Sequence, residues 1–263
     1  MRTIPPVVAL SATLTLGCGD TPVARSDVPG TTAALSTAQV NQLGALRIFF
    51  GHQSVGGNLM DGLADLARDG EPMPLRVARM SRVDGGSRGV LAHEWVGENG
   101  APASKLVAVS EALADSARGA NVAIVKFCYS DFQADTDPDA LFTAYRDQIA
   151  AWRERFPHVT FVHMTAPTVR PEGAAARWLR TVRGRFTMRA RAAKVGRYNE
   201  RLRQAYAGSE PVFDLAALEA VAGGFLNPVF TDDGEHLNAL GRRTVARQFL
   251  HFLADSVAPN VGR

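Results

Sequence analysis

The stretch that decides the fold is Leu46-Arg47-Ile48-Phe49-Phe50-Gly51-His52-Gln53-Ser54-Val55-Gly56-Gly57-Asn58. It begins with an apolar run, typical of a buried strand, and from Val55 to Ala67 apolar residues recur at helical spacing. Ser54 therefore lies at a predicted strand-to-helix junction. A strand that leads directly into a helix is the repeating unit of α/β proteins with a parallel sheet.

The rest of the chain continues this alternation. Between the predicted elements, residues 81–101 are rich in glycine and polar residues without a helical period, which predicts a long binding loop. The pattern predicts an α/β fold in three layers, with a parallel sheet of about five strands and helices on both faces. Strands are expected at 46–50, 75–80, 121–127, 159–164 and 211–215, and helices at 55–67, 105–117, 138–156, within 177–203 and at 239–254.

Length and charge limit the classes of function. With 263 residues, 46% of them hydrophobic, the chain is long enough for one sizeable α/β domain and short for two. The net charge of +3 argues against nucleic acid as the main partner. The basic residues gather in Arg177 to Arg203, which is read as a solvated helix face, with contact to an anionic surface as the alternative.

The amino terminus predicts export. Met1-Arg2, the apolar run Ile4 to Leu16 and the small Gly17 form a secretory signal pattern that is too short for a membrane span. Leu14-Thr15-Leu16-Gly17-Cys18 resembles the lipobox of bacterial lipoproteins, which implies a lipidated Cys18 and anchoring at the cell envelope; ordinary secretion is the alternative. The expected organisation is a signal peptide at 1–17, lipidated Cys18 and a flexible tether at 18–44, a folded domain at 45–256 and a tail at 257–263.

The two cysteines fit this organisation. If Cys18 carries lipid, Cys128 has no partner, and no disulfide is expected. Cys128 ends an apolar run and is interpreted as a buried small hydrophobe rather than as a thiol nucleophile. No spacing of Cys and His resembles a metal site, so neither a metal nor another cofactor is predicted.

Two distant segments can build one hydrolytic site. A serine hydroxyl needs a base to take its proton and a third group to orient that base. His236 and Asp233, in Asp233-Gly234-Glu235-His236, fit these roles for Ser54, since both segments are expected at the carboxyl edge of the sheet. The structural alternatives are a turn or helix cap at Asp233 and a helix N-cap at Ser54.

These segments resemble the SGNH or GDSL hydrolase superfamily of serine esterases and lipases. The family's last block is Asp-x-x-His, often continued by Asn and Gly, and this chain has Asp233-Gly-Glu-His236-Leu-Asn238-Ala-Leu-Gly241. The resemblance runs from about Leu46 to about Ala254 and implies a flavodoxin-like sheet and a triad of Ser54, His236 and Asp233. Two blocks depart from the pattern: Gly51-His52-Gln53-Ser54 stands in place of Gly-Asp-Ser, and Cys128-Tyr129-Ser130-Asp131 in place of Gly-x-Asn-Asp.

The resemblance also implies groups that stabilise the oxyanion. These are the backbone N–H of Ser54, a glycine N–H from Gly85-Gly86-Ser87-Arg88-Gly89, assigned to Gly86, and Ser130 at the position of the family's Asn. The alternatives are turn formation for Gly86 and a cap for Ser130. His52 is expected to contact substrate, anchor the loop or satisfy backbone carbonyls, with direct proton transfer as the minor alternative. Asn58 is expected to bond within the site or to a neighbouring loop.

Two functions remain open at this point. One is an exported, lipid-anchored serine esterase acting on a small ester or on O-acyl groups of a glycan. The other is a non-catalytic relative that binds carbohydrate or envelope components, which the two altered blocks suggest. Neither involves nucleic acid, and membrane contact is expected through the lipid anchor only.

Overall fold

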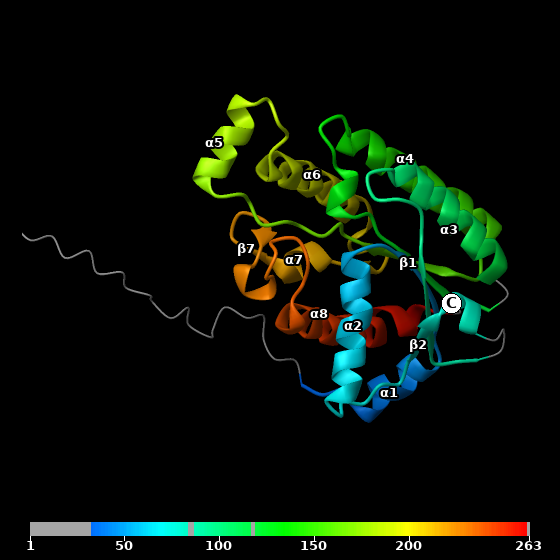
Figure 1. Cartoon of the computed structure of the whole chain (residues 1–263). Coiled ribbons are helices and arrows are strands. Elements are labelled where there is room, and N and C mark those ends of the chain that lie inside the picture. Colours follow the sequence, from blue (N-terminus) through cyan, green and yellow to red (C-terminus); the bar gives the residue numbers. More distant parts are fainter. Residues whose placement is uncertain (1–32, 84–86, 117–118, 262–263) are drawn as a thin grey trace, which may run out of the picture. The chain divides into compact units, whose positions relative to one another are not determined.

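A sheet of six parallel strands forms the centre of the computed structural model, which describes residues 33–83, 87–116 and 119–261 (Figure 1). The strand order is β2-β3-β1-β4-β5-β6, and every pairing in it is parallel. A separate antiparallel pair joins two short strands near the carboxyl edge. The strands are β1 (Arg47–His52), β2 (Arg76–Arg79), β3 (Val90–Trp95), β4 (Val122–Val125), β5 (Thr160–Met164), β6 (Val212–Phe213), β7 (Ala220–Val221) and β8 (Phe225–Leu226).

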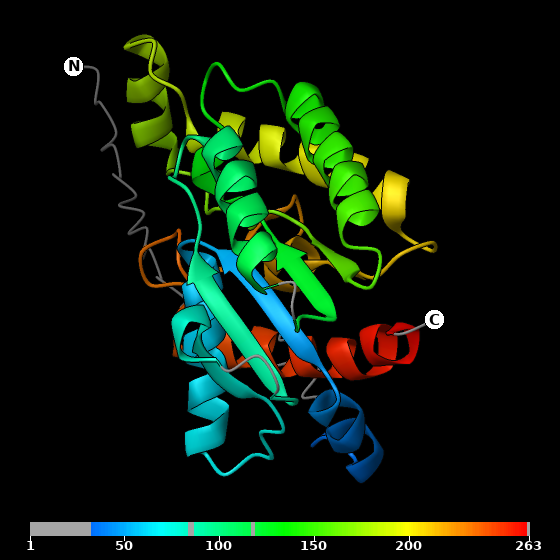
Figure 2. The same ribbon diagram turned by 90° about the vertical axis from the view of Figure 1, so that its right-hand side faces the viewer.

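Helices cover both faces of the sheet, as expected for parallel strands joined by crossovers. One layer holds α2 and α8, and the other holds α3, α4 and α6, with the sheet between them in Figure 2. The protein therefore has the predicted three-layer α/β/α fold. The helices are α1 (Thr37–Gly44), α2 (Val55–Arg68), α3 (Pro102–Ser116), α4 (Pro138–Arg155), α5 (Ala174–Val182), α6 (Met188–Tyr206), α7 (Leu215–Glu219) and α8 (Ala239–Phe252).

The decisive stretch lies at the centre of this arrangement. β1 pairs with β3 on one side and β4 on the other, and Ile48, Phe49 and Phe50 are all at most 1% exposed. α2 then packs against α8 so closely that a Cβ on Gly62 would lie 2.2 Å from the carbonyl oxygen of Arg242. This contact brings the start of α2 next to the loop that precedes α8.

The prediction of about five strands is corrected to six. The missed strand is β3, which lies inside the stretch predicted to be a long loop and pairs with both β1 and β2. Its sequence is Val-Leu-Ala-His-Glu-Trp, and only its first three residues are fully buried. Three apolar residues between glycines and charged residues are too short a run to reveal a strand by periodicity.

The folded part extends beyond both boundaries expected from the sequence. Residues 37–44 were assigned to the tether but form α1, which has a capping box between Ser36 and Gln39 and buries Leu43 completely. At the other end, Val257 was assigned to the tail but is completely buried. The basic region also divides into α5 and α6, because Gly184, at φ +60°, ends the first helix and a second begins at Met188.

Glu219, a buried acidic residue under the carboxyl edge of the sheet, makes the free energy of unfolding depend on pH. Glu219 is 1% exposed, and its Oε1 accepts a hydrogen bond from the backbone N–H of Thr168 at 2.5 Å. Burial raises the pKa of Glu219 from 4.5 to about 8, although the Thr168 N–H and the charge of Lys126 act in the opposite direction. The folded chain therefore keeps a proton here that the unfolded chain loses above pH 4.5.

The stabilising effect of this proton is present below pH 4.5 and is lost as the pH rises through about 8. We expect Glu219→Gln to remove this dependence, since glutamine keeps an acceptor for Thr168 and carries no charge. The melting temperature of the wild type should fall relative to that of the variant between about pH 5 and about pH 9. Thermal melts across this range test it, and parallel curves for the two proteins would contradict it.

Candidate active site

Ser54 lies in a strained turn between β1 and α2. Its φ is +45° and its ψ is −110°, and among the described residues it is the one non-glycine residue with positive φ. The turn is tight because a Cβ on Gly56 would lie 2.4 Å from the Cβ of His52. A strained turn of this kind between a strand and a helix exposes a serine hydroxyl at the edge of the sheet.

The Ser54 hydroxyl faces the histidine predicted to be its base. Ser54 Oγ lies 2.8 Å from His236 Nε2, and His236 Nδ1 lies 2.7 Å from Asp233 Oδ2. Ser54 begins α2 without a capping hydrogen bond from its side chain, so the alternative of a helix N-cap does not hold. The two distant segments thus meet at the carboxyl edge in the order serine, histidine, aspartate.

Asp233 uses its two oxygens for two purposes. Oδ1 accepts hydrogen bonds from the backbone N–H groups of His236 at 2.7 Å and Glu235 at 2.8 Å, which leaves Oδ2 for the imidazole. Burial raises the pKa of Asp233, but these two N–H groups and the His236 ring outweigh it and hold the pKa below its ordinary value. Asn238 caps α8 instead, by accepting from the N–H of Gly241, so Asp233 is not the cap of that helix.

Neighbouring side chains hold the histidine loop in place. The Tyr129 hydroxyl donates to Glu235 Oε2 at 2.6 Å, and the Tyr129 ring meets the His236 ring edge-on at 6.2 Å between centroids. Asn58 Oδ1 accepts from the backbone N–H of Leu237 at 3.2 Å. Of the two roles considered for Asn58, the structure shows the bond to the neighbouring loop.

Ser130 has an unusual environment. Its Oγ is buried, and no atom of the described residues hydrogen bonds to it. The cap before the next turn is formed by Cys128 and Asp131 and the cap of α4 by Asp137, so Ser130 is not a helix cap. A buried hydroxyl without a partner is costly, and its presence calls for an explanation.

A buried ion pair that the sequence did not reveal supports this loop. Lys105 and Asp131 are both completely buried, and Lys105 Nζ lies 2.5 Å from Asp131 Oδ2. Asp131 also accepts from the N–H of Cys128 at 2.7 Å and of Gly100 at 3.0 Å. It therefore joins α3, the loop after β4 and the loop after β3. No pattern in the sequence indicated this pair.

The glycine predicted to line the oxyanion site, Gly86, lies outside the described residues. The glycines in the loop after β3, at the carboxyl edge, are Gly97 and Gly100. Gln53, next to Ser54, donates from Nε2 to the carbonyl oxygens of Val96 at 3.3 Å and Gly97 at 2.7 Å. Both glycines lie inside the loop predicted at 81–101, but because β3 was missed the sequence did not show which glycines of that stretch follow a strand.

Among the described residues, the hydrogen-bond and ring contacts of His52 involve Phe50, His93 and Trp95 and not Ser54 or His236. His52 is completely buried, and its Nε2 lies 3.0 Å from His93 Nδ1 on β3. Burial, together with the charge of Lys126, lowers the pKa of His52 to about 2. His52 is therefore neutral at any physiological pH, and its observed partner is a second histidine rather than a backbone carbonyl.

Other predictions concern cysteines, metals and membranes. Cys128 is free and completely buried, with Sγ 3.6 Å from the carbonyl oxygen of Gln53, whereas Cys18 lies outside the described residues. Within the described ranges, no three His, Cys, Asp or Glu side chains gather in a way that could hold a metal ion. In the same ranges, no helix has the length and apolar character to cross a bilayer.

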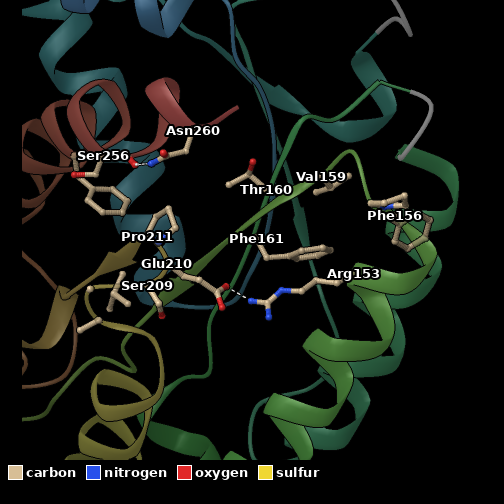
Figure 3. Close-up of a pocket in the computed structure, with 15 residues that line it drawn as sticks. Arg153, Phe156, Val159, Thr160, Phe161, Ser209, Glu210, Pro211, Ser256 and Asn260 are labelled. Carbon is tan, nitrogen blue, oxygen red and sulfur yellow. Dashed lines mark hydrogen bonds and ion pairs between the residues drawn. The ribbon is translucent and has the colours of Figure 1, made fainter. Parts of the chain in front are cut away.

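A large cavity lies at the opposite edge of the sheet. It has a volume of about 960 Å³ and is lined by residues around the first residues of β5 and β6, among them Thr160 and Pro211 (Figure 3). Arg153 and Glu210 form an ion pair across it, and Glu210 Oε2 lies 2.9 Å from His163 Nε2. None of the predicted site residues lines this cavity.

Comparisons with known proteins identify the fold. No family model and no curated protein matches the sequence. Among solved structures, a protein assigned as an acylhydrolase from Bacteroides fragilis is 16% identical with a TM-score of 0.52, covering 82% of this chain and 94% of its own. A GDSL-like lipase from Bacteroides thetaiotaomicron is 14% identical with a TM-score of 0.50, covering 80% and 89%. The chain therefore has the fold of the SGNH/GDSL hydrolases.

Proposed function

We propose that this protein is a serine hydrolase that cleaves carboxylic esters with Ser54, His236 and Asp233. The observation that carries the proposal is the continuous pair of short contacts, 2.8 Å from Ser54 Oγ to His236 Nε2 and 2.7 Å from His236 Nδ1 to Asp233 Oδ2. The strained φ of Ser54 supports it, because strain at a polar residue needs a reason that packing alone does not supply.

The chemistry follows from this geometry. With the proton of the neutral His236 ring on Nδ1 and donated to Asp233, Nε2 accepts the proton of the Ser54 hydroxyl as its oxygen attacks the ester carbonyl. The protonated ring then gives that proton to the leaving alcohol, and an acyl-enzyme remains. Water, activated by the same Nε2, hydrolyses the acyl-enzyme and regenerates Ser54.

The negative oxygen of the tetrahedral intermediate needs donors that are already in place. We assign this role to the backbone N–H of Ser54, at the start of α2, and to the Ser130 hydroxyl. Ser130 suits it because its Oγ is buried and has no hydrogen-bond partner among the described residues. The substrate would then supply the partner that the folded chain lacks.

Replacing Ser130 by alanine separates this role from a structural one. Losing one oxyanion donor typically costs about 10²- to 10³-fold in kcat. Removing a buried hydroxyl that has no partner should not lower stability. We expect kcat to fall with an unchanged or raised melting temperature, as measured by ester kinetics and thermal melts on the same sample. A lowered melting temperature with unchanged kcat would return Ser130 to a structural role.

The substrate that we propose is an ester whose acyl group reaches an open site, and an O-acylated glycan is the candidate. The side chains of His236 and Asp233 are 41% and 57% exposed, so the scissile bond can be part of a large molecule. Purified protein should be assayed against acetyl, butyryl and longer p-nitrophenyl esters and for release of acetate from an acetylated glycan. If no ester is turned over by the folded protein, a non-catalytic binding role replaces this proposal.

We further propose that the enzyme works at the cell envelope, attached through a lipid on Cys18. Each buried CH₂ of an acyl chain contributes about 0.8 kcal/mol, so several chains would hold the domain firmly. Cys18→Ser should release the protein into the soluble fraction or leave it unprocessed. Fractionation in a Gram-negative host and mass spectrometry of the mature amino terminus measure this. A wild-type chain that begins at another residue and is wholly soluble would contradict it.

A further inference from the structure

The exposed apolar side chains of this protein are distributed unevenly. Eight large hydrophobic side chains are exposed in the described ranges, each on an element that lies at or follows the carboxyl end of a strand, and seven of them lie outside α3. This is the edge that carries Ser54. The seven are Trp95, at the end of β3, Trp178, Leu179 and Val182, on α5 after β5, and Val221, Val229 and Leu240, between β6 and the first turn of α8.

α5 is the centre of this distribution. No residue of this nine-residue helix is buried, and Trp178 and Val182, one turn apart on the same side, are 67% and 63% exposed. A helix with an exposed tryptophan and no buried face is not stabilised by packing against the hydrophobic core of its own domain. In Figure 1, α5 stands away from the sheet, beside α6.

The segment that carries α5 is nevertheless fixed at its base. Glu172 accepts hydrogen bonds from the backbone N–H of Met188 at 2.9 Å and of Arg189 at 3.2 Å, which closes residues 173–187 into a loop. Just before it, the N–H of Arg170 donates to the carbonyl oxygen of Gly234 at 2.8 Å, in the turn between Asp233 and His236. The α5 segment, residues 173–187, is therefore held beside the candidate active site.

The charge of this region selects one kind of partner. Residues 170–191 contain seven arginines and one glutamate, and Arg183 and Arg185 are both exposed. A short helix with Trp and aliphatic residues on one side and arginines around it suits the boundary between headgroups and acyl chains. Arginines add attraction to anionic headgroups.

From these observations we propose that the α5 segment docks the protein on an anionic phospholipid bilayer, with Trp178, Leu179 and Val182 inserted among the headgroups and the arginines on the phosphates. The contact is separate from any lipid on Cys18 and does not depend on Ser54 being a nucleophile. It places the edge that carries Ser54 against the membrane, so that this site acts on esters at the bilayer surface.

Binding to vesicles tests the proposal. The protein is used from residue 31 onward, since residues 31–263 make up one compact unit. It should float with vesicles of phosphatidylglycerol mixed with phosphatidylcholine and not with pure phosphatidylcholine. Trp178→Glu combined with Val182→Glu should lower the affinity at least about tenfold, because the inserted residues become charged. Arg183→Gln combined with Arg185→Gln should lower it about 30-fold.

A matched control and three outcomes make the test decisive. Val107→Glu changes a 59% exposed valine on α3, outside the α5 segment, and should bind like the wild type. Circular dichroism shows that each variant is folded. The proposal is overturned if the wild type does not bind anionic vesicles, or if Val107→Glu loses as much affinity as the α5 variants. Self-association of the wild type without vesicle binding would assign the surface to a second copy instead and likewise overturn it.

A kinetic comparison links the surface to the proposed function and is separate from the binding test. The α5 variants should hydrolyse a soluble p-nitrophenyl ester at the wild-type rate but be slower on an ester embedded in anionic vesicles. Loss on both substrates would show damage to the site. Absence of all hydrolysis would contradict the proposed function and leave the binding result unaffected.

Discussion

Replacing Ser54 by alanine should lower ester hydrolysis by about 10³-fold or more while the fold is kept. The Ser54 Oγ is the atom that faces His236 Nε2 at 2.8 Å, so its removal takes away the nucleophile and leaves the base in place. The Ser54 side chain makes no cap for α2, and alanine therefore costs the helix no hydrogen bond. Steady-state kinetics on p-nitrophenyl acetate, with thermal melts on both proteins, measure the two effects.

A second serine provides the matched control. Ser209 is exposed at the opposite edge of the sheet, where its Oγ donates to the carbonyl oxygen of Tyr206, and Ser209→Ala should keep full activity. A fluorophosphonate probe should label the wild type and Ser209→Ala on Ser54 and leave Ser54→Ala unlabelled. Labelling of any other residue, or wild-type turnover by Ser54→Ala, would sink the assignment of the nucleophile.

Strands and helices could be predicted from the sequence where apolar residues form a run, or recur at regular spacing, over enough residues to identify the element. The run before Gly51 and the apolar spacing after Ser54 gave β1 and α2 within one or two residues. β3 was missed because its second half, His93 to Trp95, lies at the carboxyl edge, where the first two residues are partly buried and Trp95 is exposed, so that no apolar run marks it. The helix α1 was missed because its only fully buried residue is Leu43.

The residues of the candidate site likewise fall into those that could be predicted from the sequence and those that could not. Ser54, His236 and Asp233 could be named together because parallel strands all end at one edge, which turns order along the chain into proximity in space. The partners that depend on side-chain packing could not be named. The sequence gives no sign that Lys105 pairs with Asp131, since the pair depends on how α3 lies against the loop after β4. The partner of His52 was hidden because it lies on the missed strand, β3.

His236→Ala should lower kcat/KM by about 10³-fold or more, an effect similar to that of Ser54→Ala, because a triad without its base leaves the serine hydroxyl protonated. His52→Ala should change kcat/KM far less. It removes a buried ring and so lowers the melting temperature, but its pKa of about 2 keeps that ring neutral throughout the range in which activity is measured. Both variants are compared with the wild type well below their melting temperatures.

The pH dependence of kcat/KM distinguishes the two histidines independently of the size of the loss. Asp233 has a lowered pKa and remains ionised, and His52 remains neutral, so neither changes charge between about pH 4 and about pH 9. A fall in kcat/KM on the acidic side then does not come from Asp233 or His52, and His52→Ala should retain that limb of the profile unchanged. If His52→Ala abolishes activity and the acidic limb while His236→Ala keeps both, the base has been assigned to the wrong histidine, and the short contact between Ser54 and His236 has a structural role only.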